Sequence, residues 1–463
     1  MKIESFGAAE VVTGSCHHIQ TKELTFLVDC GMFQGKNEEK NYQEFGFDAS
    51  EIKFVLVTHG HLDHVGRLPL LYKEGFRGSI YATKATIDIA RVVLFDAAHL
   101  MEEDYITRYK KAQRKGKKAD KPLYTAKDVR DMFKEIEFID VDYNKKIKLS
   151  KNIQATYKDA GHILGSAIIK LVIKDPDKKI ITFSGDLGNK HNDILPPPET
   201  IKKTDYLFCE STYGDRNHKS FVESIQEFRK EIISTLKKDG NVIIPSFAIE
   251  RTQEVLCALK DMYKEGLLPK KTKIFLDSPM AIKATNVYVK YHRKLSSKCN
   301  KYLKKDGHIF EFDLLKYTTK VDQSKKINDV NSKAIIIAGS GMCNGGRILH
   351  HLKNRIWNPN NTILFVGYQA EKTLGREIVN GEKWIRIYGE EILVQAKIVT
   401  INGFSAHADQ NELLEWIKPM KNSLKAVFLI HGEKEKQEVF KQKIIEKFDL
   451  KTHIVEPKEV IGL

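Results

Sequence analysis

The amino-acid sequence predicts an α/β protein in which a doubly wound second domain is inserted into the first. Short apolar runs alternate with helical patterns, and polar motifs rich in histidine and aspartate close several of these runs. Such alternation is typical of proteins that layer helices against sheets. Up to about Asp205, we expect strands at Ile3–Phe6, Leu24–Asp29, Phe54–Thr58, Ile168–Ile173 and Lys179–Ser184.

A second block of strand and helix patterns begins near Tyr213. Ser220 and Glu223 have the spacing of a capping box, which predicts a helix that runs to Lys238. The chain later returns with the apolar run Ala426–Ile430, so residues 1–208 and 397–463 are expected to form one domain around an insertion of residues 209–396. The insertion contains four apolar runs, each followed by a loop and a helical pattern, as in a doubly wound parallel sheet: Asn241–Pro245, Lys273–Leu276, Ala334–Ile337 and Ile363–Val366.

Composition agrees with this architecture and indicates the kind of partner and the cellular compartment to expect. A chain of 463 residues is long enough for two domains with substantial cores. Lys and Arg outnumber Asp and Glu by 76 to 61, and a net charge of +15 suits a polyanionic partner, although a lysine-rich proteome gives the same excess. Six scattered cysteines without a C-x-x-C pair indicate free thiols in a reducing cytoplasm. The sequence shows no signal peptide and no membrane-spanning apolar stretch, so we expect no membrane partner.

Three histidines and one aspartate lie within the six residues from His59 to His64, directly after a predicted strand. Imidazole and carboxylate groups are common ligands of zinc. His59 and His61 can converge on one ion, whereas Asp63 and His64 then reach a neighbouring position, so the spacing suits two metal ions better than one. The alternative, a surface loop that happens to be rich in histidine, is disfavoured because α/β proteins place their sites at strand ends.

The motif resembles the signature of the metallo-β-lactamase superfamily, and further motifs of that superfamily follow in order. Asp29 ends an apolar run, His162 lies in Gly161-His162-Ile163, and Asp186 follows Ser184-Gly185. The resemblance implies an αββα sandwich for the outer domain. It also implies that His59, His61 and His162 hold one zinc ion, that Asp63 and His64 hold a second, that Asp186 bridges them, and that Asp29 orients the loop from behind.

Three later motifs resemble those of the β-CASP branch, whose members are nucleases. They supply Glu210 in Cys209-Glu210-Ser211, His407 in Ala406-His407-Ala408, and His431, which completes the second metal site. A histidine at the last position is typical of members that act on RNA. The resemblance therefore implies a metallo-β-lactamase sandwich with an inserted β-CASP domain, two Zn²⁺ ions per chain, and RNA, preferably single-stranded, as the partner.

The predicted reaction is zinc-dependent hydrolysis of RNA phosphodiester bonds by two-metal activation of a bridging water, which leaves 5′-phosphate and 3′-hydroxyl ends. The catalytic candidates are Asp63, Glu210 and His407, with His407 as general acid and Glu210 orienting its ring. The alternatives are a DNA nuclease of the same family, another hydrolase with the same metal core, or a non-catalytic RNA-binding scaffold. Whether the chain forms a homodimer stays open.

Other segments are candidate substrate contacts. The glycine-rich loop with Ser340, Gly341 and Arg347 precedes a helical pattern and is expected to bind phosphate, and Tyr368 is available for base stacking. A basic run from Arg108 to Lys121 is interpreted first as a solvated helix face, with an RNA guide as the alternative. His17 and His18 are expected to be ordinary polar residues.

Overall fold

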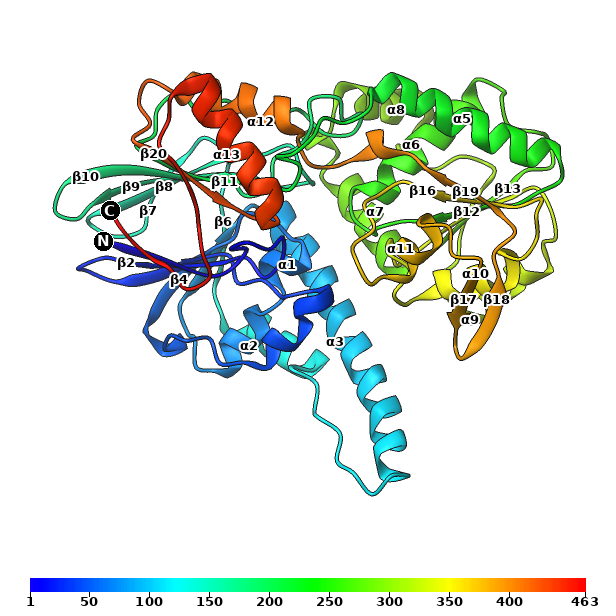
Figure 1. The fold of residues 1–463 in the computed structure, drawn as a ribbon, viewed down its shortest axis with the longest axis horizontal. Helices are drawn as coiled ribbons and strands as arrows, with labels where there is room; N and C mark the ends of the chain where they lie inside the picture. Colours follow the sequence, from blue (N-terminus) through cyan, green and yellow to red (C-terminus); the bar gives the residue numbers. More distant parts are fainter. The chain divides into compact units, whose positions relative to one another are not determined.

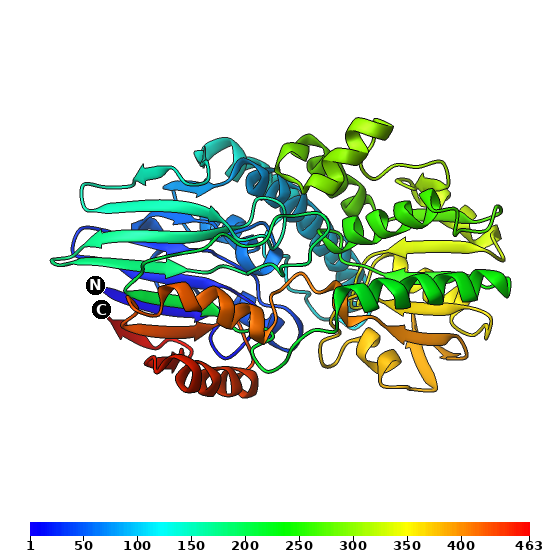
Figure 2. The ribbon, with the colours of Figure 1, turned by 90° about the horizontal axis from the view of Figure 1, so that it is seen from above.

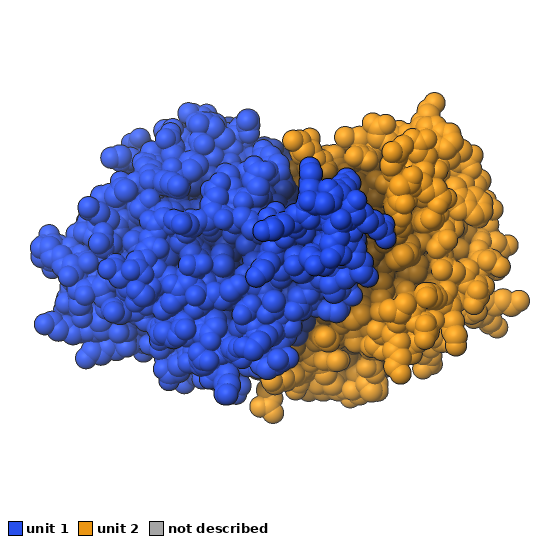
Figure 3. Space-filling view, turned by 90° about the horizontal axis from the view of Figure 1, so that it is seen from below, with its two compact units in different colours: residues 1–190, 197–217, 407–463 blue, residues 191–196, 218–406 orange. Residues whose placement is uncertain are grey.

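The computed structural model describes residues 1–463, apart from the side chain of Asn402. The chain folds into two compact units (Figure 3). The first unit contains Met1–Lys190, Pro197–Asn217 and His407–Leu463, and the second contains His191–Pro196 and His218–Ala406. The second unit is therefore an insertion within the first, as the sequence predicts.

Two seven-stranded sheets form the centre of the first unit. The first sheet has the order β22 (Val460–Gly462), β1 (Lys2–Gly7), β2 (Cys16–Gln20), β3 (Thr25–Val28), β4 (Ile52–Leu56), β5 (Ser79–Ala82) and β6 (Phe138–Asp140). The second has the order β21 (Thr452–Ile454), β20 (Ala426–Ile430), β11 (Tyr206–Glu210), β10 (Lys178–Phe183), β9 (Ala167–Lys174), β8 (Ile153–Asp159) and β7 (Lys146–Lys148). In the first sheet, neighbouring strands from β22 to β3 are antiparallel and those from β3 to β6 are parallel. In the second sheet, β10, β11, β20 and β21 run parallel.

Alternation along the strands builds four layers from these two sheets. Val28 and Phe208 face the core between the sheets, whereas their neighbours Leu27 and Leu207 face outward toward helices. Helices cover the outer face of each sheet, so the unit is an αββα sandwich, as expected (Figure 1, Figure 2). The first sheet is covered by α1 (Leu62–Val65), α2 (Leu68–Lys73), α3 (Lys84–Gln113) and α4 (Ala126–Glu135), and the second by α12 (Gln410–Ile417) and α13 (Lys434–Phe448).

An aromatic ladder fixes the register of three central strands in the second sheet. Phe183, Phe208 and Phe428 are directly paired residues of β10, β11 and β20, with stacked rings 4.7 and 4.8 Å apart. Each strand then ends in a functional motif, at Asp186, Glu210 and, for β20, His431. Because a one-residue slip would turn every side chain to the other face, the ladder sets where these motifs lie.

The second unit is a doubly wound block, again as the sequence predicts. Its six-stranded sheet is parallel throughout. Four of its strands are each followed by a loop and a helix: β12 (Val242–Pro245), β13 (Lys273–Asp277), β15 (Ala334–Ala338) and β16 (Thr362–Phe365). One prediction is wrong in detail, because Ser220 is the N-cap of its helix but its side chain accepts no capping hydrogen bond.

The strands and helices of the second unit have the following bounds. The sheet has the order β14 (Leu315–Tyr317), β13 (Lys273–Asp277), β15 (Ala334–Ala338), β12 (Val242–Pro245), β16 (Thr362–Phe365) and β19 (Lys397–Thr400), and β17 (Trp384–Ile387) pairs with β18 (Glu390–Leu393). The helices are α5 (Phe221–Lys237), α6 (Arg251–Lys264), α7 (Pro279–Lys290), α8 (Ser297–Asp306), α9 (Val321–Lys326), α10 (Arg347–Arg355) and α11 (Leu374–Val379).

The helices of both units are too short or too polar to cross a membrane. Among the residues that the structure describes, none of the helices combines the length and the apolar character that a membrane span requires.

The aromatic ladder gives a first prediction. Phe208→Ala removes a fully buried ring between two stacked neighbours, so we expect a loss of about 3–5 kcal/mol in unfolding free energy, measured by urea denaturation of the first unit. Val439→Ala, at a 42% exposed position of α13, serves as the control and is expected to cost less than about 0.5 kcal/mol. Equal costs for the two variants would contradict the central role of the ladder.

Candidate metal centre

The loop after β4 carries four of the predicted ligands on a tightly held backbone. His61 is the N-cap of the short helix α1, so the chain turns between His59 and Asp63. The carbonyl oxygen of Asp63 accepts a hydrogen bond of 2.8 Å from the backbone N–H of Ser15. A Cβ atom at Gly31 would lie 1.6 Å from that same oxygen, so only glycine permits this approach. The positions of Asp63 and His64 therefore depend on the neighbouring loop after β3.

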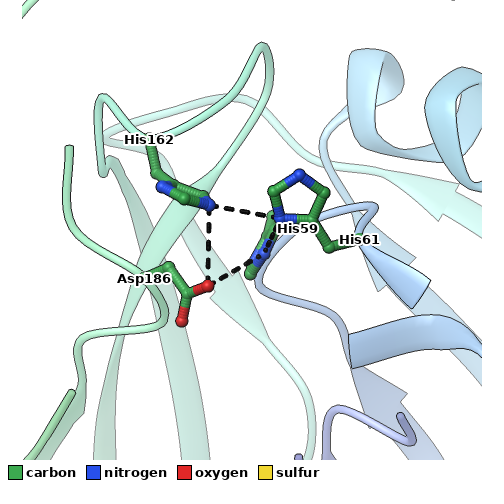
Figure 4. Close-up of side chains that lie close together, drawn as sticks. All are labelled: His59, His61, His162 and Asp186. Atoms are coloured by element: carbon green, nitrogen blue, oxygen red, sulfur yellow. Dashed lines mark hydrogen bonds and ion pairs between the residues drawn. The ribbon is translucent and has the colours of Figure 1, made fainter. Parts of the chain in front are cut away.

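His59, His61, His162 and Asp186 form the first ligand group, with ligand atoms that all lie within 4.8 Å of one another (Figure 4). His61 Nδ1 lies 3.1 Å from His59 Nε2 and 3.2 Å from His162 Nε2. Oδ2 of Asp186 lies 3.4 Å from His59 Nε2 and 3.5 Å from His162 Nε2. The sequence-predicted residues of the first site thus converge on one point.

Asp63, His64 and His431 form the second group, and Asp186 joins the two groups. Nε2 of His64 lies 3.2 Å from Nε2 of His431, and Oδ2 of Asp63 lies 3.6 Å from the same atom of His431. The other oxygen of Asp186, Oδ1, lies 3.4 Å from His64 Nε2 and 3.5 Å from His431 Nε2. One carboxylate therefore presents one oxygen to each group, which is the arrangement expected of a bridging ligand.

The donor set fits a divalent metal. Zinc holds nitrogen at 2.0–2.1 Å with tetrahedral angles, which places two ligand atoms about 3.3–3.4 Å apart, close to the separations within the two groups. Burial lowers the pKa of His59 to about 3 and that of His61 to about 4, so both imidazoles are neutral at physiological pH. Although burial opposes ionisation of Asp186, the surrounding histidines hold its pKa well below the ordinary value. Neutral imidazoles and an ionised carboxylate are the protonation states that a metal ion requires.

Asp29 contacts His64 on the side of the ring that faces away from the second group. Its Oδ2 lies 2.7 Å from Nδ1 of His64, and the same carboxylate accepts hydrogen bonds from the backbone N–H and the hydroxyl of Thr58 at 2.7 and 2.8 Å. Nε2 of His64 is thereby directed toward the second group. Although burial opposes protonation, Asp186 and Asp29 raise the pKa of His64 well above the ordinary value, so this position favours a positive charge.

His431 is held by its backbone and by Thr212. Its φ of +52° lies in the left-handed region, and its N–H donates to the carbonyl of Ala8 at 2.7 Å. The Thr212 hydroxyl lies 3.1 Å from Nδ1 of His431, which leaves Nε2 facing the second group. Such outer contacts fix the ring orientation of metal-binding histidines.

Glu210 and His407 form a third pair beside Asp186. Glu210 is fully buried at the end of β11, and its Oε1 accepts a hydrogen bond from the backbone N–H of Leu187 at 2.5 Å. Nδ1 of His407 lies 3.1 Å from one Glu210 oxygen and 3.3 Å from the other. Burial lowers the pKa of His407, but the Glu210 charge outweighs it and raises the pKa to about 9. His407 therefore carries a proton at neutral pH.

His17 is a site neighbour that the sequence does not reveal. It is 1% exposed, and it lines a small cavity behind the ligands together with Asp29, His64 and His431. Its Nδ1 lies 2.8 Å from the hydroxyl of Ser5, and its Nε2 lies 3.3 Å from that of Ser15. His17 is therefore buried beside the two groups, and it belongs to none of the candidate metal groups among the residues that the structure describes.

The predicted substrate contacts all belong to the second unit. Arg347 donates to Oδ1 of the buried Asp277 at 2.6 Å and to the carbonyls of Thr318 and Thr319. Its guanidinium therefore holds the loop to the end of β13. Ser340 accepts from the backbone N–H of Asn344 at 3.0 Å, and a Cβ atom at Gly341 would meet the ring of Phe247 at 2.7 Å. The Arg376 guanidinium lies 5.5 Å from the ring centre of Tyr368.

Known protein families match most of the chain. Residues 18–205 match the metallo-beta-lactamase superfamily domain, residues 252–378 the Beta-Casp domain, and residues 391–455 the Zn-dependent metallo-hydrolase RNA specificity domain. Ribonuclease TTHA0252 of Thermus thermophilus is 39% identical over 436 residues, which is 94% of each chain. The chain belongs to the β-CASP family of the metallo-β-lactamase superfamily.

Other similar proteins are longer than this chain or share its fold alone. The transcription termination factor FttA of Methanocaldococcus jannaschii is 31% identical over 98% of this chain and 70% of its own length, and that of Pyrococcus abyssi is 33% identical over 100% and 71%. A crystal structure of a protein of unknown function from Enterococcus faecalis has the same fold, with a TM-score of 0.55 and 13% identity over 100% of this chain and 99% of its own.

The contacts of Asp29 give a second prediction. Asp29→Asn keeps the shape of the side chain but removes the charge that holds Nδ1 of His64, so we expect metal affinity to fall by about 10–100-fold. Competition against a fluorescent chelator measures the affinity. Asp142→Ala, which removes an exposed carboxylate that pairs with Lys145, is the control and is expected to leave the affinity unchanged. Unchanged metal affinity in Asp29→Asn would show that Asp29 has no orienting role.

Proposed function

We propose that this protein is a zinc-dependent ribonuclease that hydrolyses RNA phosphodiester bonds with two zinc ions and leaves 5′-phosphate and 3′-hydroxyl ends. The carboxylate of Asp186, with one oxygen facing each ligand group, is the observation that carries the proposal. The match to an RNA specificity domain and the likeness to a ribonuclease over 94% of both chains support RNA as the substrate. Single-stranded RNA is the form we propose.

In this proposal the seven clustered side chains hold the ions. His59, His61 and His162 bind one, Asp63, His64 and His431 bind the other, and Asp186 contacts both. When bound, two zinc ions would supply the positive charge that favours ionisation of water near neutral pH and balances charge on the phosphate. Asp29 and Thr212 keep the ligating nitrogens of His64 and His431 directed at the site.

His407 is the proposed general acid. Because its Nδ1–H donates to Glu210, proton transfer falls to Nε2 of the ring. Its raised pKa of about 9 keeps the ring protonated at neutral pH, so it can protonate the 3′-oxygen that leaves phosphorus. Glu210 keeps a proton on Nδ1 of His407 and stabilises the positive charge of the protonated ring. Asp63, the remaining catalytic candidate, acts as a ligand of the second ion.

The proposed activity is tested by presenting zinc-loaded protein with three substrates. We expect cleavage of end-labelled single-stranded RNA, with 5′-phosphate products, and much slower cleavage of the matched DNA and of a thiolester. Asp63→Ala removes one ligand of the second ion and is expected to abolish RNA cleavage and to lower the zinc content toward one ion per chain, measured by elemental analysis.

Each other outcome contradicts a defined part of the proposal. Preferential cleavage of DNA would reassign the substrate, and hydrolysis of the thiolester alone would remove the nuclease function. Full activity of Asp63→Ala with two zinc ions still bound would contradict the second metal site.

The role of His407 gives a further prediction. His407→Ala is expected to keep both zinc ions and to cut RNA about 10²–10⁴-fold more slowly, the usual contribution of a general acid. An RNA with a 3′-phosphorothiolate linkage, whose leaving group needs no proton, is expected to recover most of this activity. Loss of zinc, or equal impairment on the activated RNA, would show that His407 is a ligand or a structural residue.

The pH profile provides an independent readout of the same pair. Activity is expected to fall as pH rises through the pKa of His407, because only the protonated ring can act as an acid. Glu210→Gln removes the charge that raises this pKa, so the alkaline fall in kcat/KM is expected to move to lower pH. Glu456→Gln, at an exposed position near the C-terminus, is the control and leaves the profile in place.

A further inference from the structure

The end of α3 and the loop after it contain no fully buried residue and carry a concentration of positive charge. The last buried residue of α3 is Ala98, and the remaining fifteen residues of the helix, His99 to Gln113, are exposed or half-buried. We call residues 99–121 the α3 arm. Figure 1 shows it as the cyan end of α3 and the loop that stands clear of both sheets of the first unit.

The charge of the arm is far from balanced. From Arg108 to Lys121 there are eight cations and only one anion, Asp120, so fourteen residues carry +7 of the net +15 of the chain. Arg108 pairs with Asp104 at 2.6 Å. None of the other seven cations forms an ion pair with a carboxylate in the part of the chain that the structure describes: Lys110, Lys111, Arg114, Lys115, Lys117, Lys118 and Lys121.

Stability of the helix does not account for this charge. Cations in the last turn interact favourably with the helix dipole by about 0.3–1 kcal/mol each, but the effect fades beyond that turn. The helix dipole therefore explains the presence of Lys110 and Lys111 but not that of the cations from Lys115 onward. Neighbouring like charges such as Lys110 and Arg114 instead cost about 0.2–0.5 kcal/mol per pair. The arm thus retains a repulsion that a polyanion would relieve.

The chemistry of the arm favours RNA over an acidic membrane. A helix that lies on a membrane needs an apolar face opposite its cations. In the cationic part of the arm, from Arg108 to Lys121, Tyr109 is the only large apolar side chain, and the exposed Leu100 and Ile106 precede these cations. Tyr109 is 44% exposed and lies beside Tyr105, with ring centres 5.8 Å apart. Exposed aromatic rings among cations suit the bases and phosphates of a nucleic acid strand.

The start of α3 lies beside the metal centre. The hydroxyls of Thr83 and Thr86 donate to the carbonyl of Gly165, three residues after His162, at 2.8 Å each. From Thr86 to Lys110 the helix extends for about 36 Å at 1.5 Å per residue. At the 3.4 Å per nucleotide of a helical strand, this distance corresponds to about ten nucleotides.

We propose that the α3 arm is a second RNA-binding site, which binds the phosphate backbone about ten nucleotides from the bond to be cut, without regard to sequence. The inference deepens the proposed ribonuclease function and rests on it. Binding at the arm contributes only when the RNA is long enough to reach from the metal centre to the arm. Long RNAs are therefore held at two places and short ones at one.

The test compares two quadruple variants on RNAs of two lengths. The arm variant is K110Q/K111Q/R114Q/K115Q, and the matched control K418Q/K443Q/K447Q/K451Q removes the same charge from exposed lysines around α12 and α13. Affinity for single-stranded RNAs of about 6 and about 30 nucleotides is measured at several salt concentrations. Zinc-loaded protein with His407→Ala is used throughout, because that change slows cleavage during the measurement.

For the arm variant we expect affinity for the long RNA to fall at least tenfold. The slope of log affinity against log salt is expected to become shallower by about 0.7 for each phosphate that the arm no longer neutralises. Affinity for the short RNA is expected to match that of the control. Hydrogen exchange of residues 105–121 is expected to slow when long RNA is added to the unmodified arm, which reports binding without any substitution.

Several results would overturn the proposal. Equal decreases in the arm variant and the control, or equal decreases on short and long RNA, would mean that only the overall charge matters. Binding of phosphatidylserine vesicles or poly-glutamate that depends on the arm, with RNA affinity unchanged, would reassign the partner. The arm's binding of long RNA without any cleavage by the unsubstituted enzyme would instead contradict only the proposed function.

Discussion

Desolvated carboxylates at the ends of neighbouring strands are the constraint on which the rest of this structure depends. Asp29, Asp186 and Glu210 are at most 2% exposed, and each ionised oxygen taken out of water needs a compensating partner. Asp29 and Glu210 obtain theirs from backbone N–H groups and histidines. Asp186 faces only imidazole nitrogens, four of them, across both of its oxygens. A divalent cation on each side would balance the charge of that carboxylate, as in the proposed function.

The fold provides the rigidity that such a site requires. Stacked Phe183, Phe208 and Phe428 hold three neighbouring strands in register, and Asp186, Glu210 and His431 lie at or just after the ends of these strands. The backbone is strained at two positions that directly follow strands. Asp29 and His431 have φ values of +61° and +52°, conformations that cost on the order of 1–3 kcal/mol and persist only when their surroundings hold them. The Asp29 carboxylate accepts a hydrogen bond from the N–H of Thr58, and the N–H of His431 donates to the carbonyl of Ala8, so both residues are fixed in these conformations.

The sequence predicts the layered fold because that fold follows from local patterns, whereas all seven clustered side chains are expected only from the resemblance of their motifs to a known family. Alternation such as Leu27 outward and Val28 inward predicts strands, and the spacing from His59 to His64 predicts metal ligands. What it does not predict depends on pairing between distant segments. His17 lines a cavity together with Asp186 and His431, which come from remote parts of the chain. Arg347 donates to Asp277, seventy residues away, so the sequence predicts a phosphate contact for this residue but does not reveal its ion pair.

Two metal ions that share the carboxylate of Asp186 are the centre of this account. Anomalous diffraction from zinc-loaded crystals, recorded on both sides of the zinc absorption edge, tests for them most directly. The account predicts two anomalous peaks about 3.5–4 Å apart, one among His59, His61 and His162 and the other among Asp63, His64 and His431. A single peak, or peaks away from Asp186 in crystals soaked to saturation with zinc, would contradict it.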